Sequence, residues 1–275
     1  MRASVSPVVA GGSLLGLVVL AALLAPWLTQ DPAQIDLDSV LRPPSSAHLL
    51  GTDGLGRDVG ARLLHGARTS LLIGFATGAL SLLLGLPLGA AAGYFGGAVD
   101  SAASRLIESV MCFPGLVVAI ALLSVGPPWL LALSEPVRIA IALGLIGWTP
   151  AARYMRGEFR RLRGSDAVIA ARAAGAGHPR IILRHLLPRS LAPVVVSLAF
   201  GVGSAALAEA ALSFVGVGIS PPRASWGELL GQALHQAGRA WWLAVFPGGA
   251  LFLLVLGCNR LGDGIRDRLD PIRPA

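Results

Sequence analysis

Six long apolar segments constrain the fold of this chain more than any other feature of its sequence. They lie at about residues 8–28, 70–94, 106–125, 137–154, 191–214 and 241–259. Each is close to the roughly 17–25 residues that an α-helix needs to cross a bilayer. Lipid offers no hydrogen-bond partners to an exposed backbone, so we expect each segment to be a membrane-spanning helix. The sequence therefore predicts an all-α membrane protein with six transmembrane helices.

Composition agrees with this class. The chain has 54% hydrophobic and 13% charged residues, which is too apolar for an ordinary soluble domain. Gly85, Pro87 and Gly89 interrupt the second span, and Pro114 interrupts the third, as bundled membrane helices tolerate. A cleavable signal peptide is the rival interpretation of residues 1–28. Its apolar region is longer than the usual 7–15 residues and lacks a clean cleavage site, so we expect an uncleaved span.

The distribution of arginine predicts the orientation. The side of the membrane that holds residues 153–190 carries fifteen arginines, whereas the other side carries seven arginines matched by seven acids. Loops rich in positive charge stay in the cytoplasm, and six spans place both termini on one side. We therefore expect both termini and residues 153–190 to be cytoplasmic, although the arginine distribution around the first span alone favours the opposite orientation.

Residues 153–190 contain nine arginines and two short helical patterns. The first pattern, at 166–174, places Ile169, Ala170 and Ala173 on one face, and the second, at 179–187, places Ile182 and Leu186 on one face. Between them, residues 175–177 read Gly-Ala-Gly and permit a turn, and Pro179 suits the start of a helix. This pattern predicts a helix-turn-helix projection that binds a partner at the membrane surface, although the loop could instead serve only to fix the topology.

The absence of lysine excludes two kinds of chemistry, because all 22 basic residues are arginine. A P-loop needs its phosphate-binding lysine, and Schiff-base catalysis needs an amine. If ATP drives this protein, another chain hydrolyses it. None of the five histidines has metal-ligand spacing to a second ligand, so no metal site is expected. The two cysteines, Cys112 and Cys258, lie in separate apolar spans and do not suggest a disulfide.

Four segments carry a family resemblance that covers nearly the whole chain beyond the first span. Residues 166–188 read DAVIAARAAGAGHPRIILRHLLP and resemble the cytoplasmic coupling loop of ABC importer permeases. Residues 48–74, HLLGTDGLGRDVGARLLHGARTSLLIG, and residues 207–230, LAEAALSFVGVGISPPRASWGELL, resemble the C-type permease subunit of dipeptide, oligopeptide and nickel ABC importers, as does NRLGDGIRDRLDP at 259–271. All four occur in the family's order.

The resemblance implies a type I ABC importer permease fold in a bacterial plasma (inner) membrane. The expected organisation is an N-terminal helix and external segment at 1–69, a transmembrane domain at 70–262 and a cytoplasmic tail at 263–275. The chain would form half of a pathway for peptides and would not be an enzyme. Its expected partners are a homologous B-type permease subunit, two ATP-binding subunits that hold ATP and Mg, and an extracytoplasmic solute-binding protein; no nucleic acid is expected.

The resemblance also implies which residues contact the ATPase subunits. Ala173, Gly175 and Ala176 would permit close approach, Arg180 would pair with acids, and the apolar residues would pack. The expected contact residues are Asp166, Ile169, Ala170, Ala173, Gly175, Ala176, Arg180 and Ile182. Family members usually carry Glu where this chain has Ile169, so a charged contact at that position is not expected here.

Two acids within the predicted spans are further candidates. Glu108 follows Arg105 by three residues, which favours a local ion pair over a gate. Glu209 is the only acid in a span of small and aliphatic residues, and a buried carboxylate there usually faces other helices or a water-filled cavity. We expect Glu209 to line the pathway or to join helices. Outside the spans, Asp53, Arg57 and Asp58 in GTDGLGRD are expected to pair locally.

Other classes of protein remain open from the residues alone. A secondary transporter would couple to an ion gradient and usually shows internal repeats with ionisable residues at mid-membrane, and only Glu209 qualifies. A membrane enzyme would need a catalytic cluster, and no nucleophile-base or metal cluster is evident. Among importers, nickel chelates and glutathione-like solutes are alternatives to peptides.

Overall fold

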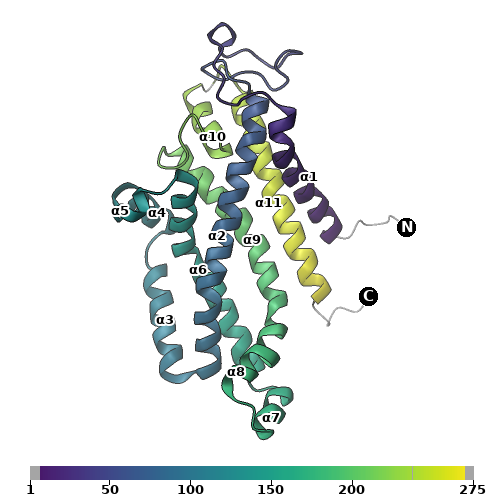
Figure 1. Ribbon diagram of the computed structural model, residues 1–275, viewed down its shortest axis with the longest axis vertical. Helices are drawn as coiled ribbons and strands as arrows, with labels where there is room; N and C mark the ends of the chain where they lie inside the picture. Colours follow the sequence, from purple (N-terminus) through teal and green to yellow (C-terminus); the bar gives the residue numbers. More distant parts are fainter. Residues whose placement is uncertain (1–6, 237, 270–275) are drawn as a thin grey trace, which may run out of the picture.

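Long helices run side by side through the computed structural model, which describes residues 7–236 and 238–269 (Figure 1). The long helices are α1 (Pro7–Leu28), α2 (Val59–Phe95), α3 (Gly97–Met111), α4 (Gly115–Val125), α6 (Glu135–Leu162), α9 (Leu187–Phe214), α10 (Trp226–His235) and α11 (Trp242–Leu269). The shorter ones are η1 (Leu37–Ser39), α5 (Pro128–Leu131), α7 (Asp166–Ala173), α8 (His178–Ile181) and the π-helical η2 (Ile182–Leu186). The fold is therefore helical, as predicted.

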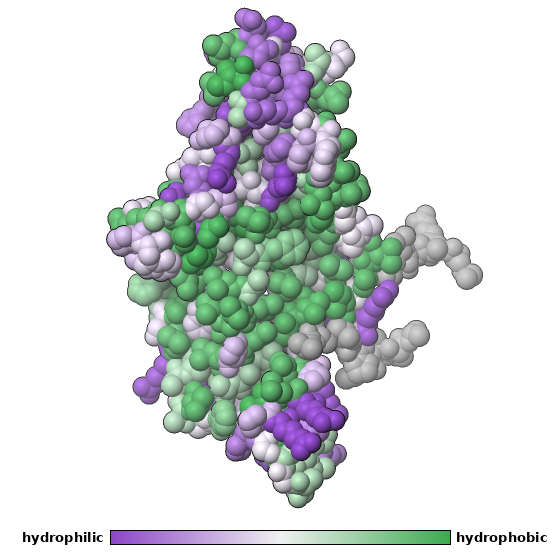
Figure 2. All heavy atoms as spheres, in the orientation of Figure 1, coloured by the Kyte–Doolittle hydropathy of each residue, from purple (hydrophilic) through white to green (hydrophobic). Residues whose placement is uncertain are grey.

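The bundle has a hydrophobic middle and two polar ends. Figure 2 shows a continuous hydrophobic band between hydrophilic surfaces at the top and bottom of the molecule. Leu17 of α1, Leu83 of α2 and Phe252 of α11 are more than half exposed. Such a surface would be unstable in water but is compatible with lipid. We call residues 29–58, which cross the top of Figure 1, the cap, and we call the opposite end, where α7 and α8 lie, the loop end.

Four helices among the described residues are long and apolar enough to cross a membrane: Pro7–Leu28, Val59–Phe95, Val194–Phe214 and Trp242–Arg268. A fifth span would combine α3 and α4, which are bent by 77°. The predicted continuous helix at 106–125 is therefore wrong. Pro114 lies at the break as the N-cap of α4, and its ring removes the amide hydrogen that a continuous helix would use.

The fourth predicted span, at 137–154, lies within α6. This helix has 28 residues, which is long enough to cross a membrane, but it is less apolar than the four helices named above. Charged side chains explain the difference, because Glu135 and Arg138 lie at its start and several arginines lie in its second half. Six spans therefore remain a prediction, whereas four or five are supported.

Helices α2 and α6 pack closely through a row of glycines on α2. Gly85, Gly89 and Gly93 recur every fourth residue and so lie on one face of the helix. A Cβ built at these positions would lie 2.6 Å, 2.2 Å and 2.5 Å from backbone oxygens of α6, at Trp148, Ala152 and Arg156 respectively. Membrane helices use such small residues to bring two backbones into contact. From the sequence we expected only that a bundled membrane helix tolerates Gly85 and Gly89. In the structure these glycines also allow α2 and α6 to pack closely.

Glycines also bring the backbones of α1 and α11 into close contact. A Cβ at Gly11 would lie 2.4 Å from the backbone nitrogen of Leu261, and a Cβ at Gly264 would lie 2.4 Å from the backbone nitrogen of Val8. The two helices run side by side (Figure 1), so Pro7 and the end of α11 lie at the same end of this pair. Helix α9 packs against α2 and α11 and completes the bundle.

A buried ion-pair network fixes the cap. As predicted, Arg57 pairs with Asp53, and the Nε–Oδ2 distance is 2.7 Å. Arg62 of α2 lies 3.5 Å from the same carboxylate and 2.7 Å from Glu228 of α10. Asp58 instead contacts His48 and accepts a hydrogen bond from the backbone of α2 at its N-terminus. The hydrogen bond from Asp58 to the first turn of α2 explains why this helix begins at Val59, before the predicted start at residue 70.

The glycine row generates a stability prediction. We expect Gly89→Ala to lower the free energy of unfolding by about 1–3 kcal/mol, because the added methyl group must displace the backbone of α6. The matched control is Gly249→Ala in α11, where a Cβ meets nothing within 4 Å. Thermal unfolding of the two purified variants in detergent measures the difference. Equal melting temperatures would contradict the inferred backbone contact.

Candidate functional site

A cavity of about 570 Å³ lies within the bundle and is bounded mainly by α2, α6 and α9. Helix α2 contributes Thr77, Gly78, Ser81 and Leu82; α4 contributes Gly115 and Leu116; α6 contributes Leu143, Ile146, Gly147, Pro150, Ala151 and Tyr154; α9 contributes Val196, Ser197, Leu198, Phe200, Gly201, Ser204, Ala205 and Ala208; and α11 contributes Arg266. This volume is typical of a site for a small molecule.

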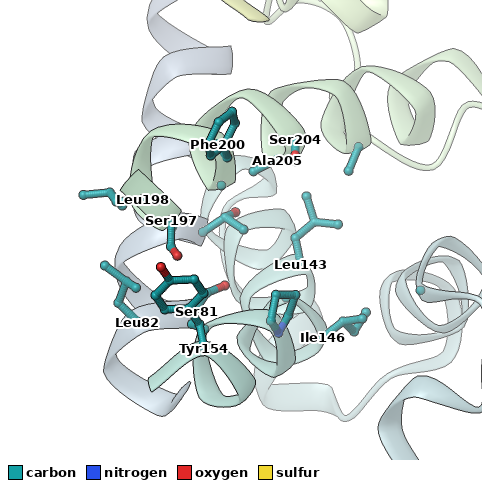
Figure 3. Close-up of a pocket in the computed structure, with 18 of the residues that line it drawn as sticks. Ser81, Leu82, Leu143, Ile146, Tyr154, Ser197, Leu198, Phe200, Ser204 and Ala205 are labelled. Carbon is teal, nitrogen blue, oxygen red and sulfur yellow. The ribbon is translucent and has the colours of Figure 1, made fainter. Parts of the chain in front are cut away.

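The wall of the cavity combines apolar surface with free hydroxyl groups. Figure 3 shows Ser81, Tyr154 and Ser197 on one side of the cavity and Leu143 and Ile146 on the other. Within the described residues, the hydroxyls of Ser81, Tyr154 and Ser197 make no hydrogen bond. They are therefore available to a polar solute, while the aliphatic side chains accommodate its apolar parts. The sequence analysis identified none of these residues, since their apolar and hydroxyl types are ordinary in a membrane helix.

Glu209 does not line this cavity. Its side chain is fully buried between helices, where Ser70 of α2 donates to Oε2 at 2.9 Å and Ser213 of α9 donates to Oε1 at 2.8 Å. Ser70 also lies 3.4 Å from the backbone nitrogen of Trp226 at the start of α10. Of the two roles expected for Glu209, the geometry is that of a residue joining helices. A buried carboxylate with two donors avoids much of the cost of desolvation.

Glu108 lies on the surface of α3, beside a second hollow of about 510 Å³. That hollow is also lined by Cys112, Arg153 and Arg156. The ion pairs among the described residues do not include Arg105 with Glu108, so the expected local pair is not formed. Arg156 instead pairs with Asp100 of α3. Nor do three His, Cys, Asp or Glu side chains come together as possible metal ligands anywhere in residues 7–236 and 238–269.

Residues 166–181 form the predicted helix-turn-helix projection at the loop end. Helix α7 ends at Ala173, and Gly175 then adopts a φ of +76°, a conformation that glycine accepts without strain. The backbone nitrogen of Ala176 donates to the carbonyl of Ala171 at 2.9 Å and closes the turn. Pro179 lies in the first turn of α8, as expected. The turn chemistry was thus readable from the sequence.

The second predicted helix is not separate from the bundle. Helix α8 ends at Ile181, and the chain continues through η2 directly into α9 without leaving a helical conformation. A π-helical segment inserts an extra residue into a helix and is common at functional sites. Residues 179–187 are therefore helical, as the pattern predicted, but they do not end there as a short helix. This segment is instead the start of a cavity-lining helix.

The projection has a buried face and an exposed face. Val168 and Ile181 are 1% exposed and pack in a hydrophobic cluster with Met155, Phe159 and Leu186. The exposed contact candidates are Asp166, Ile169, Ala170, Ala173, Gly175 and Arg180. Ala176 and Ile182 are partly buried against the cluster. Val168 and Ile181 were not expected to be buried, although their helical spacing from the other apolar residues marked a second, inward face.

Comparison with known proteins identifies the family. Residues 85–272 match the family described as the binding-protein-dependent transport system inner membrane component. A Brucella suis protein provisionally named a peptide transport system permease protein is 42% identical over 94% of this chain and 85% of its own length. The dipeptide permease protein DppC of Alkalihalophilus pseudofirmus is 38% identical over 92% of this chain and 82% of its own. The oligopeptide permease protein OppC of Bacillus subtilis is 35% identical over 93% and 82%.

A solved structure agrees on the fold. The permease architecture of the MetNI methionine ABC transporter, described in inward-facing conformations, matches 76% of this chain and 96% of that chain. The TM-score is 0.58 and the sequence identity is 18%. At this identity the likeness concerns the arrangement of helices alone.

The contacts of Glu209 generate a prediction. We expect Glu209→Leu to lower the free energy of unfolding by about 1–3 kcal/mol, because two buried serine hydroxyls lose their acceptor, whereas Glu209→Gln keeps an acceptor oxygen and loses less. The control is Glu158→Leu in α6, which removes an ion pair to the exposed Arg161. Thermal unfolding of the purified variants measures the order. If the leucine variant at 209 is as stable as the wild type, the carboxylate does not hold the helices together.

Proposed function

The chain belongs to the family of binding-protein-dependent transport system inner membrane components, and from this premise we propose that it is a permease subunit of an ATP-driven importer for peptides. One observation carries the proposal: relatives named as peptide, dipeptide and oligopeptide permease proteins are 35–42% identical to more than nine-tenths of the chain. We place peptides ahead of nickel chelates and glutathione-like solutes for the same reason.

The cavity supports a pathway for peptides. Free hydroxyls of Ser81, Tyr154 and Ser197 suit the amide groups of a peptide backbone, and the leucine and isoleucine side chains opposite suit apolar side chains. A pathway must hold its solute weakly enough to release it. Scattered neutral hydroxyls meet this requirement better than a buried charge would. In this proposal the chain supplies half of the pathway, and a homologous B-type permease subunit supplies the other half.

The chain itself binds no nucleotide in this proposal. It contains no lysine, and a P-loop depends on one. ATP and Mg would be bound by two ATPase subunits at the loop end, which we place in the cytoplasm with both termini. An extracytoplasmic solute-binding protein would deliver the peptide at the cap end. A proton-coupled secondary transporter would use acidic or histidine side chains along its pathway, whereas Glu209 lies outside the cavity wall and the charged lining residue is Arg266.

We assign the contact with the ATPase subunits to residues 166–188. The exposed face of α7 presents Ile169, Ala170 and Ala173, which are small or apolar and so permit a close approach. Asp166 of α7 and Arg180 of α8 are also exposed and would pair with charges of the partner. The opposite face is held to the bundle by Val168 and Ile181. A partner that moves α7 would therefore move the packed ends of α2, α6 and α9 as well.

Reconstitution tests this function. We expect the purified chain alone to hydrolyse no ATP. In proteoliposomes with a second permease, the ATPase subunits and the binding protein, we expect uptake of a labelled dipeptide that requires ATP. Labelled nickel chelate and glutathione serve as competing substrates. Peptide uptake without ATP, or ATP hydrolysis by the chain alone, would contradict the proposal.

The turn at Gly175 provides a second test. No atom lies within 4 Å of a Cβ built there, so a substitution is opposed by the φ of +76° and not by crowding. We expect Gly175→Val to leave the chain in the membrane but to weaken ATPase association and reduce uptake, because a β-branched residue disfavours this conformation. Pull-down of the ATPase subunits and an uptake assay measure the two effects.

Two controls accompany this test. Gly175→Asn should retain more activity than Gly175→Val, since asparagine tolerates a positive φ better than other residues do. Gly164→Val changes an open loop glycine whose φ is not positive, and it should behave like the wild type. Normal association and uptake in Gly175→Val would mean that the loop only sets the topology.

A further inference from the structure

Tyr94 lies at the loop end of α2, where that helix meets the projection. Its ring is buried, with 4% of its surface exposed, and its hydroxyl lies 2.8 Å from Nδ1 of His178 at the start of α8. The two rings meet edge to face at 5.6 Å between centroids. A hydrogen bond at this distance is short and well formed. The end of α2 is thus joined directly to the projection.

Other groups converge on the same tyrosine. The guanidinium of Arg172 in α7 lies 5.7 Å from the centre of the Tyr94 ring, within the range of a cation–π interaction. Arg163, just after α6, donates to the carbonyl oxygen of Tyr94 at 3.4 Å. The neighbouring Phe95 ring lies 5.9 Å from that of His178. Tyr94 therefore contacts groups following α6, in α7 and in α8 at one point.

The bond from Tyr94 to His178 stands apart from the other contacts of the projection. Within the described residues, it is the only side-chain hydrogen bond or ion pair that joins residues 166–181 to the helices of the bundle. The other contacts are the cation–π contact of Arg172, the ring contacts of His178 with Tyr94 and Phe95, and apolar packing through Val168 and Ile181. Apolar contacts have no preferred direction, whereas a hydrogen bond fixes the relative position of two groups. This bond therefore sets how the projection sits against α2.

Helix α2 connects this point to the cavity. Gly93, the residue before Tyr94, makes the close backbone contact with α6, so the end of α2 is held firmly. In the other direction, Ser81 and Thr77 of the same helix line the cavity. At 1.5 Å per residue, Ser81 lies about 20 Å along the helix from Tyr94. A displacement applied at Tyr94 reaches the cavity wall through one continuous helix.

We propose that Tyr94 and His178 form the link through which movement of the projection is passed to α2 and to the cavity wall. The inference rests on the proposed function, since it assumes that a partner moves the projection. In it, Tyr94 and His178 are positioning residues: neither touches the solute nor the nucleotide. When the hydrogen bond between Tyr94 and His178 is lost, the projection slides against α2. ATP is then hydrolysed without a matching movement of the cavity wall.

The test compares variants in the reconstituted complex, and the measured quantity is the number of peptides imported per ATP hydrolysed. Tyr94→Phe removes only the hydroxyl and keeps the ring and its cation–π contact. His178→Leu removes the ring nitrogen that bonds the hydroxyl, whereas His178→Asn retains a polar atom near the position of Nδ1. We expect Tyr94→Phe and His178→Leu each to lower the ratio about threefold to tenfold, as loss of one hydrogen bond can do, and His178→Asn to restore most of it.

The double variant and a matched control complete the design. Tyr94→Phe combined with His178→Leu should lower the ratio no further than either change alone, because both remove the same bond. His65→Leu changes a histidine of α2 outside residues 166–188 that makes no side-chain hydrogen bond within the described residues, and it should keep the wild-type ratio.

Each result bears on the inference. An unchanged ratio in Tyr94→Phe, multiplying effects in the double variant, or an equal loss in His65→Leu would overturn it. So would loss of subunit assembly in both Tyr94→Phe and His178→Leu, which would assign the bond to folding. Failure of the wild-type complex to import any peptide would instead refute the proposed function, so the two failures are distinguishable.

Discussion

The close contact between α2 and α6 is the constraint on which the rest of the structure depends. It exists because Gly85, Gly89 and Gly93 leave no side chains between the two backbones. Lipid provides little hydrophobic driving force for helix association, so van der Waals contact between closely packed backbones is what holds such helices together. The pair then fixes two walls of the cavity. Its lower end also provides the platform on which the projection packs.

A buried charge network performs a comparable task at the cap end, by a different physical means. Arg62 has no exposed surface, and it contacts both Asp53 of the cap and Glu228 of α10. Burying charges is costly, and removing one partner would leave the others uncompensated. The network therefore tolerates few alternative arrangements. It links α10 to the cap and to the start of α2, which lie far from α10 in the sequence, and it holds the cap over the end of α2.

Between these two ends the molecule behaves as a set of continuous helices. Helix α9 continues from the projection, to which η2 joins it, and passes along the cavity wall. Helix α2 also connects the cavity with the projection, and its chain runs from Ser81 in the cavity wall to Tyr94 beside the projection. A movement at the loop end can thus reach the cavity along two helices.

The sequence by itself determined those properties that depend on short stretches of chain. Apolar run length predicted a helical membrane protein, and the Gly-Ala-Gly segment predicted the turn at Gly175. Tertiary structure alone decided which side chains meet. Glu209 receives a hydrogen bond from Ser70, 139 residues away in sequence, and the cavity collects ordinary serines and leucines from several helices. The structure also decided that Pro114 breaks the helix at 106–125 and that Val168 packs against the bundle, although the sequence held a signal for each. Local patterns fix the conformation of a segment, because backbone sterics and hydrogen bonds act between near neighbours, whereas a binding surface depends on how distant segments pack, which no local pattern specifies.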